Sequence, residues 1–177
     1  MNFELSEEQK MIQQNVERFV QDNYDLPKRV ELSSQDPGYS KDYWNSMAEL
    51  GWLGLPFNEE DGGFGGNQID TLVIMEQFGK GLVLEPFLAN VVLGGGAIQM
   101  GGSEELKNEI LSSLIEGSKQ LTLAYAEQQS RFDLEDVATS ARKEGEKYII
   151  NGQKSMVLNA ESADHLVVVT RTNGSQV

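Results

Sequence analysis

The stretch Ala124-Tyr125-Ala126-Glu127-Gln128-Gln129-Ser130-Arg131-Phe132-Asp133 stands where the character of the chain changes. Before it, apolar residues recur with the spacing that is typical of helices. After it, short apolar runs alternate with turn residues, as they do in strands. The change near Lys119 predicts an α+β protein, with a helical domain over residues 1–118 and an incomplete antiparallel β domain over residues 119–177.

Helices are predicted in the first part from the spacing of apolar residues and from capping residues. Ser6 and Gln9 form a capping box, while Ser40 and Ser103 are suited to cap two further helices. The run Gly94-Gly95-Gly96 is costly inside a helix, so that helix is either interrupted there or packs closely through its small residues. The predicted helices cover approximately residues 6–24, 40–51, 67–79, 86–100 and 103–117.

Short strands and turns are predicted in the second part. A hairpin is expected around Glu144-Gly145-Glu146, and Asn151-Gly152 is expected to be a second turn that positions the next strand. A set of strands this small leaves unpaired edges, so the isolated chain is expected to associate with copies of itself. The predicted strands cover residues 121–125, 137–142, 147–150, 155–158 and 165–171.

Charge and composition narrow the classes of partner. The chain has 177 residues and a formal net charge of −14, from 28 acidic and 14 basic side chains. An acidic surface repels nucleic-acid phosphates and anionic lipid head groups, so no nucleic acid and no membrane are expected as partners. Residues 1–5 lack the basic region and the apolar core of a signal peptide, and no apolar run reaches the roughly 18 residues of a membrane span. The expected compartment is the cytoplasm.

Cysteine and histidine are too scarce for several kinds of site. The chain has no cysteine, which excludes disulfides, thiolate metal sites and a cysteine nucleophile. Its one histidine, His165, has no second imidazole with which to share a metal, and we interpret it as a strand-edge residue beside Asp164. No metal site is therefore predicted.

Several segments resemble, in order and spacing, motifs of the acyl-CoA dehydrogenases. Leu50-Gly51-Trp52-Leu53-Gly54-Leu55-Pro56 and Glu60-Asp61-Gly62-Gly63-Phe64-Gly65-Gly66 are similar to the glycine-rich turn that follows a helix in that family. Tyr148-Ile149-Ile150-Asn151-Gly152-Gln153-Lys154 is similar to its "YxxNGxK" hairpin, and residues 124–133 stand where it has "TEPxAGSD". Together these matches are specific.

The resemblance implies a helical N-terminal domain, a β domain, and FAD held between the β domain and a C-terminal helical bundle. In such enzymes a glutamate of the bundle removes a proton alpha to the thioester of an acyl-CoA, and a hydride passes from the β carbon to the flavin. This chain corresponds to only part of that architecture and has no counterpart of the glutamate. It is therefore expected to be a truncated reading frame or an excised fragment. No catalytic residue is assigned, and the chain alone is expected to be inactive.

The resemblance also places the flavin and the substrate on this sequence. Ala126 stands where the family has a hydroxyl that contacts the flavin, Met156 where it has a tryptophan that covers the ring, and Leu158 where it has a threonine. These replacements remove side-chain hydrogen-bond donors, so the segment contacts the flavin through backbone N–H groups or is plain β-domain core. Phe132 is the expected substrate-contacting residue. The expected cofactor-binding residues are Leu123, Tyr125, Ala126, Glu127, Met156 and Leu158.

Three functions remain open at this point. The chain is a fragment of an FAD-dependent acyl-CoA dehydrogenase, or a non-catalytic partner subunit of a heteromeric one, or part of a related flavin oxidase or monooxygenase. The altered "TEP" segment is similar to that of small-subunit-type members of the family, such as the small subunits of pimeloyl-CoA dehydrogenases, in which two unlike chains share a flavin site. The expected partners are an acyl-CoA thioester and either further copies of the chain or a sister subunit.

Overall fold

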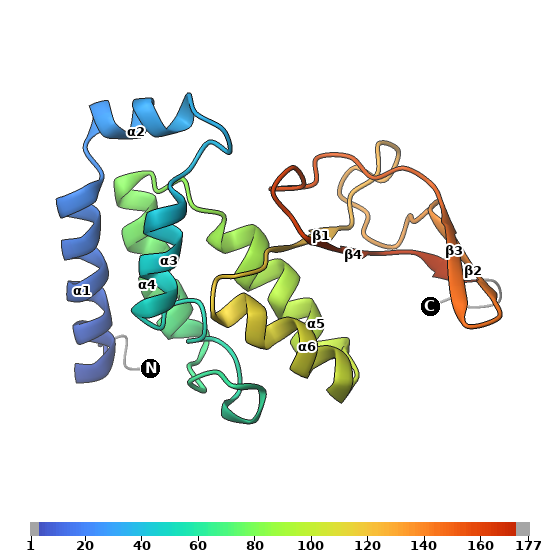
Figure 1. Ribbon diagram of the computed structural model, residues 1–177, viewed down its shortest axis with the longest axis horizontal. Coiled ribbons are helices and arrows are strands. Elements are labelled where there is room, and N and C mark those ends of the chain that lie inside the picture. Colours follow the sequence, from blue (N-terminus) through green and yellow to red (C-terminus); the bar gives the residue numbers. More distant parts are fainter. Residues whose placement is uncertain (1–3, 173–177) are drawn as a thin grey trace.

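A computed structural model describes residues 4–172 and shows a group of helices followed by a smaller β region (Figure 1). The hairpin lies at the end of the β region that is farthest from the first helix (Figure 1). Residues 1–3 and 173–177, at the two ends of the predicted domains, lie outside the described residues. The helical elements are α1 (Glu7–Asn23), α2 (Leu26–Ser33), α3 (Lys41–Glu49), the short 3-10 helix η1 (Glu59–Asp61), α4 (Gln68–Gly81), the π-helix η2 (Leu88–Gly95), α5 (Gly96–Gly101) and α6 (Glu104–Ile115).

The predicted caps hold the ends of several helices. The Ser6 hydroxyl accepts the backbone N–H of Gln9 (3.1 Å), and the Gln9 side chain accepts the backbone N–H of Ser6 (3.0 Å), which is the expected capping box of α1. Ser40 and Ser103 cap α3 and α6 in the same way. The predicted end of α4 at Gly79 is wrong, because this helix continues to Gly81.

The helix α2 was not predicted from the sequence. Its N-cap is Asp25, whose carboxylate accepts the backbone N–H of Lys28 at 2.7 Å. Pro27 lies in the first turn, where its missing N–H has no intrahelical partner to lose. This proline therefore opens α2 in addition to following α1.

The glycine run does not interrupt the fourth predicted helix, because η2 passes directly into α5. A Cβ at Gly94 would lie 2.8 Å from the Cβ of Leu121, and one at Gly95 would lie 2.5 Å from Cζ of Phe57. Both distances are too short for non-bonded carbon atoms. The two glycines thus allow η2 to pack closely on Phe57 and on the first strand. Of the two alternatives for this glycine run, the structure has close packing and not an interrupted helix.

The β region contains two small sheets with mixed pairing. Strand β1 (Leu121–Ala124) pairs in parallel with β4 (His165–Val168). In the second sheet, β2 (Ser140–Glu144) forms the expected antiparallel hairpin with β3 (Lys147–Asn151) and pairs in parallel with β5 (Arg171–Thr172). The antiparallel prediction is therefore confirmed for the hairpin, whereas the other two pairings are parallel.

Two details of the predicted β region are wrong. The residues 155–158 do not form a strand: Met156 has a positive φ of 51°, which breaks the extended conformation. The pair Asn151-Gly152 does not form a hairpin turn, because Asn151 is the last residue of β3, opposite Ser140. The chain leaves β3 after Asn151 and returns irregularly to the start of β4.

The main core lies among the helices and includes the start of β1. Phe19 meets Trp52 edge to face, with ring centroids 5.2 Å apart, and Phe78 meets Phe87 in the same way at 5.4 Å. Leu121 is completely buried in this cluster, so the first strand of the β region is part of the helical core. The largest fully buried apolar side chains are Phe57, Phe87, Met47, Leu53, Ile74, Leu111, Leu114 and Leu121.

Candidate functional site

Most of the predicted cofactor residues lie in two segments that the fold brings together, residues 125–127 directly after β1 and residues 154–158 between β3 and β4. We call these segments the paired loops. The backbone N–H of Ser155 donates to the carbonyl oxygen of Ala126 at 2.9 Å. The Thr122 hydroxyl donates to the carbonyl oxygen of Leu158 at 2.5 Å. Backbone hydrogen bonds therefore fix the paired loops beside each other and beside β1.

Leu123 and Phe132 lie apart from the paired loops. Leu123 is a half-buried residue of β1 that pairs with Val167 of β4. Phe132 belongs to the turn after the first loop, and its side chain is 99% exposed. Phe132 consequently packs on none of the other predicted site residues.

A buried ion pair joins one residue of each of the paired loops. Lys154 Nζ lies 2.6 Å from Glu127 Oε1, and the two side chains are 8% and 2% exposed. Lys154 Nζ also donates to the carbonyl oxygen of Tyr125 at 3.2 Å. Lys154 belongs to the "NGxK" motif, but its partner could not be named from the sequence because Glu127 belongs to a different motif.

Both carboxylate oxygens of Glu127 accept hydrogen bonds. Its oxygens accept the backbone N–H groups of Ala138 (2.8 Å) and Thr139 (3.0 Å) and the side-chain amide of Gln129 (2.7 Å), in addition to the Lys154 ammonium. The hydrogen bond from Lys154, followed by those from Thr139 and Gln129, holds the pKa of Glu127 well below its usual range. The carboxylate is thus an anion whose acceptors are in use inside the protein, and the backbone N–H and carbonyl of Glu127 are also bonded, to Ser130.

The paired loops expose apolar side chains and contain backbone N–H groups without an acceptor. The side chains of Tyr125, Met156 and Leu158 are 43%, 89% and 49% exposed. Within the part of the chain that the structure describes, the backbone N–H groups of Ala126, Met156 and Leu158 donate no hydrogen bond. A flat ring with polar atoms along one edge suits such residues, because apolar side chains pack on its plane and N–H groups donate to its edge. The residues present therefore fit one wall of a flavin site, without side-chain donors at these positions.

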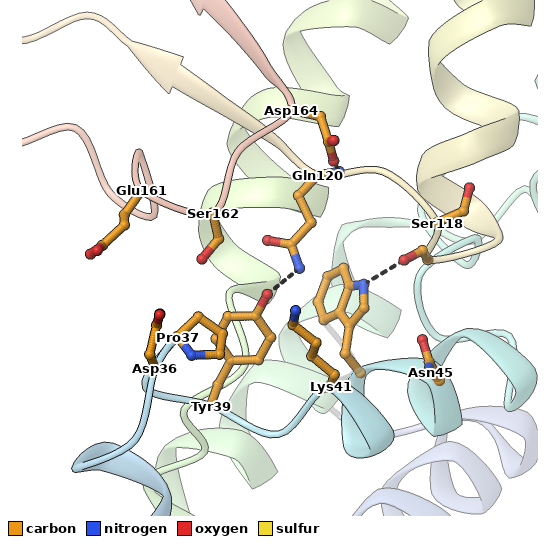
Figure 2. A pocket seen from close by; sticks show the side chains of 12 residues that line it. Asp36, Pro37, Tyr39, Lys41, Asn45, Ser118, Gln120, Glu161, Ser162 and Asp164 are labelled. Carbon is orange, nitrogen blue, oxygen red and sulfur yellow. Dashed lines mark hydrogen bonds between the residues drawn. The ribbon is translucent and has the colours of Figure 1, made fainter.

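A polar cavity of about 470 Å³ lies elsewhere, where the helices meet the β region (Figure 2). Gln120 donates to the Tyr39 hydroxyl at 2.6 Å, and the Trp44 indole donates to the carbonyl oxygen of Gly117 at 3.1 Å. Figure 2 shows Lys41 and Glu161 among the side chains that line it, and none of the predicted cofactor residues lines it. This cavity is therefore separate from the paired loops.

The described residues contain neither a metal-binding cluster nor a membrane-spanning helix. Among residues 4–172, no group of three or more histidine, aspartate or glutamate side chains is arranged to hold a metal ion. Over the same residues, no helix combines the length and the apolar character that crossing a membrane requires.

Similar proteins were found by sequence and by structure. The chain is 33% identical over 176 residues to a probable acyl-CoA dehydrogenase, YngJ, of Bacillus subtilis, which covers 98% of this chain and 46% of that protein. The fold matches an acyl-CoA dehydrogenase from Bacillus anthracis solved in complex with FAD, with a TM-score of 0.85, 29% identity, and coverage of 98% of this chain and 30% of that one. It also matches a chain of the ChsE4–ChsE5 complex of Mycobacterium tuberculosis, with a TM-score of 0.88 and 24% identity, over 98% of this chain and 46% of that one.

Two family profiles together match nearly the whole chain. The acyl-CoA dehydrogenase N-terminal domain matches residues 6–118, and the acyl-CoA dehydrogenase middle domain matches residues 122–177. The chain spans about half the length of the curated relatives that it matches. From these matches and the fold described above, the chain belongs to the acyl-CoA dehydrogenase family.

Proposed function

We propose that the chain supplies the helical domain, residues 1–118, and part of the β domain, residues 119–177, of an FAD-dependent acyl-CoA dehydrogenase. In this proposal the paired loops form one wall of the flavin site. The supporting observation is the combination of exposed apolar side chains with free N–H donors at Ala126, Met156 and Leu158. When bound, FAD supplies the hydride acceptor.

The residues of the chain then have separate tasks. Tyr125 and Met156 would hold the flavin through their exposed side chains, and the free backbone N–H groups of Ala126, Met156 and Leu158 would donate hydrogen bonds to it. Phe132, which is fully exposed on the turn after the first loop, is available to contact the acyl-CoA substrate. Each of these contacts binds or orients a ligand, and none transfers a proton.

The chain alone is proposed to be inactive. A general base must accept a proton at the pH of the reaction and must reach the substrate. Glu127, the carboxylate of the first of the paired loops, is buried, bonded to Lys154 and held in its anionic form by its low pKa. It therefore cannot serve as the base, and the proton acceptor of the complete enzyme must come from outside this site.

Amide hydrogen exchange with and without FAD tests the flavin wall directly. Saturating FAD is expected to slow exchange at residues 125–127 and 154–158, while the amides around the polar cavity, such as Gln120, serve as an internal control. Protection confined to the cavity, or absent at every concentration of FAD, would contradict the proposal.

Flavin retention tests the inactivity of the isolated chain. The chain is purified with excess FAD and desalted, and its visible spectrum is recorded. Because Ala126, Met156 and Leu158 carry no side-chain donors, the expected result is little retained flavin and no bleaching by an acyl-CoA. A stoichiometric flavin band that an acyl-CoA bleaches would overturn this part of the proposal.

A partner subunit of a heteromeric acyl-CoA dehydrogenase is the second candidate. The residues Ala126, Met156 and Leu158, which stand where the family has two hydroxyls and an indole, favour it, since a sister chain would then have to supply the missing contacts. One similar structure is described as a complex of two proteins, ChsE4 and ChsE5. Co-expression with a longer family member from the same source distinguishes the candidates: a stable heteromer with fewer flavins than chains supports the partner subunit, and separate elution of the two chains rejects it.

A further inference from the structure

The ion pair between the paired loops connects segments that are distant in the sequence. Lys154 donates to Glu127 and to the carbonyl oxygen of Tyr125, so it holds the first loop at two points. Glu127 in turn accepts the backbone N–H groups of Ala138 and Thr139, which lead into β2. The side chains of the pair therefore join the end of β1, the approach to β2 and the segment after β3.

Removal of either Lys154 or Glu127 is expected to destabilise the protein around the ion pair. Both side chains are almost completely buried, at 8% exposed for Lys154 and 2% for Glu127. Removal of one partner from a buried pair leaves the other charge without compensation in a medium of low polarity. The position of Lys154 relative to Tyr125 and Glu127 is therefore tightly determined.

The backbone next to Lys154 adopts a conformation that needs support. Met156 has a φ of 51°, in the left-handed region that side chains other than glycine rarely adopt. Such residues persist where the surrounding structure fixes the chain on both sides. Lys154 and Ser155 fix the chain before Met156, and the hydrogen bond from Thr122 to Leu158 fixes it afterwards.

We propose that Lys154, held by Glu127, is the positioning residue of the flavin wall: it keeps the paired loops together so that the free N–H groups of Ala126 and Met156 face one ligand. The inference rests on the proposed function for the identity of the ligand. It rests on the structure for the positioning itself, since the hydrogen bonds exist without FAD. A residue with a purely structural role would stabilise the whole β region and would not act selectively on the paired loops.

The experiment compares Lys154→Met with Lys154→Arg and with a matched control. Lys119→Met removes the ammonium of another ion pair that bridges distant segments, 3.0 Å from Asp164, but this pair is exposed at 48% and 37%. The first readout is exchange of the Ser155 amide, which bonds to Ala126 across the paired loops. The second is the affinity for FAD itself, measured by quenching of flavin fluorescence.

Lys154→Met is expected to speed exchange at Ser155 at least about tenfold, the order of effect of losing one charge-assisted hydrogen bond. It is expected to weaken FAD binding by a similar factor, while Lys154→Arg restores most of both readouts and Lys119→Met changes neither. Unchanged exchange at Ser155 in Lys154→Met would overturn the proposal, as would an equal effect of Lys119→Met. If no variant and no wild-type chain binds FAD, the proposed function fails, and the exchange measurement still decides the positioning role.

A second variant covers the case in which Lys154→Met does not fold. The double variant Glu127→Gln with Lys154→Met removes both buried charges, so it avoids an uncompensated charge and is expected to retain helical circular dichroism. It still lacks the hydrogen bond to the carbonyl oxygen of Tyr125. Faster exchange at Ser155 in a folded double variant supports the proposal, and wild-type exchange there contradicts it.

Discussion

The side-chain oxygen of Asn90, in the π-helix η2, accepts the backbone N–H of Leu121, the first residue of β1, at 2.8 Å. Asn90 and Leu121 are both completely buried. The contact sets the direction in which β1 leaves the helices. The position of the first of the paired loops, which follows β1 directly, therefore depends on a side chain of the helical part.

Asn90→Ala is expected to lower the free energy of unfolding by about 1–3 kcal/mol, since it leaves the N–H of Leu121 buried without an acceptor. Gln77→Met is the contrasting change. Gln77 is also buried, and its amide nitrogen has no hydrogen-bond partner among residues 4–172, so an apolar side chain of similar length is expected to be neutral or stabilising. Urea denaturation measures the free energy of unfolding of both variants. An equal decrease in Asn90→Ala and Gln77→Met would show that the hydrogen bond of Asn90 to Leu121 does not stabilise the protein.

The glycine run offers a comparison between neighbouring positions. Gly95→Ala places a Cβ 2.5 Å from Phe57 and is expected to destabilise the protein by about 1–3 kcal/mol through overpacking. At Gly96 a Cβ meets nothing within 4 Å, so Gly96→Ala is expected to stabilise the protein by about 0.4–1 kcal/mol through the lower entropy of the unfolded chain. Opposite shifts of the urea midpoint confirm the packing argument. A loss of stability in Gly96→Ala would count against it.

The buried carboxyl of Glu85 predicts a dependence of stability on pH. Burial raises the pKa of Glu85, and the Tyr24 hydroxyl and the backbone N–H of Ser40 donate to it. A folded pKa above the unfolded value of about 4.3 contributes stability that is complete below that pH and is lost as the pH rises through the folded pKa. Glu85→Gln removes this titration, so its melting temperature is expected to fall less than that of the wild type between about pH 4.5 and pH 8.

Glu127 serves as a control, because its pKa is shifted in the direction opposite to that of Glu85. Its lowered pKa contributes stability above the unfolded value of about 4.3, and that stability is lost on acidification. Glu127→Gln is therefore expected to change the acid side of the profile, and Glu85→Gln the neutral side. A profile of Glu85→Gln that is superimposable on that of the wild type would contradict the prediction for Glu85.

Restored hydroxyls are expected to strengthen flavin binding. Ala126→Thr with Leu158→Thr returns hydroxyls to the positions where the family has them, and each new hydrogen bond is expected to tighten FAD binding by about 2- to 13-fold. Val157→Thr adds a hydroxyl of the same shape at a neighbouring position and serves as the matched control. Fluorescence titration with FAD measures the affinity of the wild type, the double variant and Val157→Thr. Equal gains in the double variant and in Val157→Thr would show that the hydroxyls do not reach the flavin at defined positions.

Exposed apolar residues on β3 predict self-association of the isolated chain. Strand β3 lies at the edge of its sheet, and Tyr148, Ile149 and Ile150 are 57%, 42% and 52% exposed. An exposed apolar edge strand is a template for pairing with another copy. Sedimentation is expected to show association at about tens of micromolar, and Ile149→Lys is expected to reduce it. A wild-type chain that remains monomeric over this range would disprove the prediction.

The helical part could be predicted well because its determinants are local. The caps at Ser6, Ser40 and Ser103 lie where the helices begin, since a cap and the N–H groups that it accepts are neighbours in the sequence. The helix α2 (Leu26–Ser33) lies outside the predicted helices. Asp25 followed by a proline in the first turn is a recognisable start signal, so this error could have been avoided.

The candidate site could be predicted only in outline. The sequence motifs indicate which segments matter, but the contact between Glu127 and Lys154 depends on how the chain returns after β3, which no local pattern encodes. Residues 155–158 are predicted as a strand from their apolar run, yet tertiary contacts on both sides of Met156 hold it in a left-handed conformation. Local propensity was overridden there by long-range hydrogen bonds.

The parallel pairing of β1 with β4 has a consequence for the order of events during synthesis. The whole hairpin lies between these strands in the chain, so β1 emerges from the ribosome well before its partner does. Contacts close in sequence form sooner than those that close long loops, and the helices that receive Leu121 have by then been made. We therefore expect Leu121 to settle against the π-helix before β4 is made, so that β1 is already anchored to the helical core when its partner strand arrives.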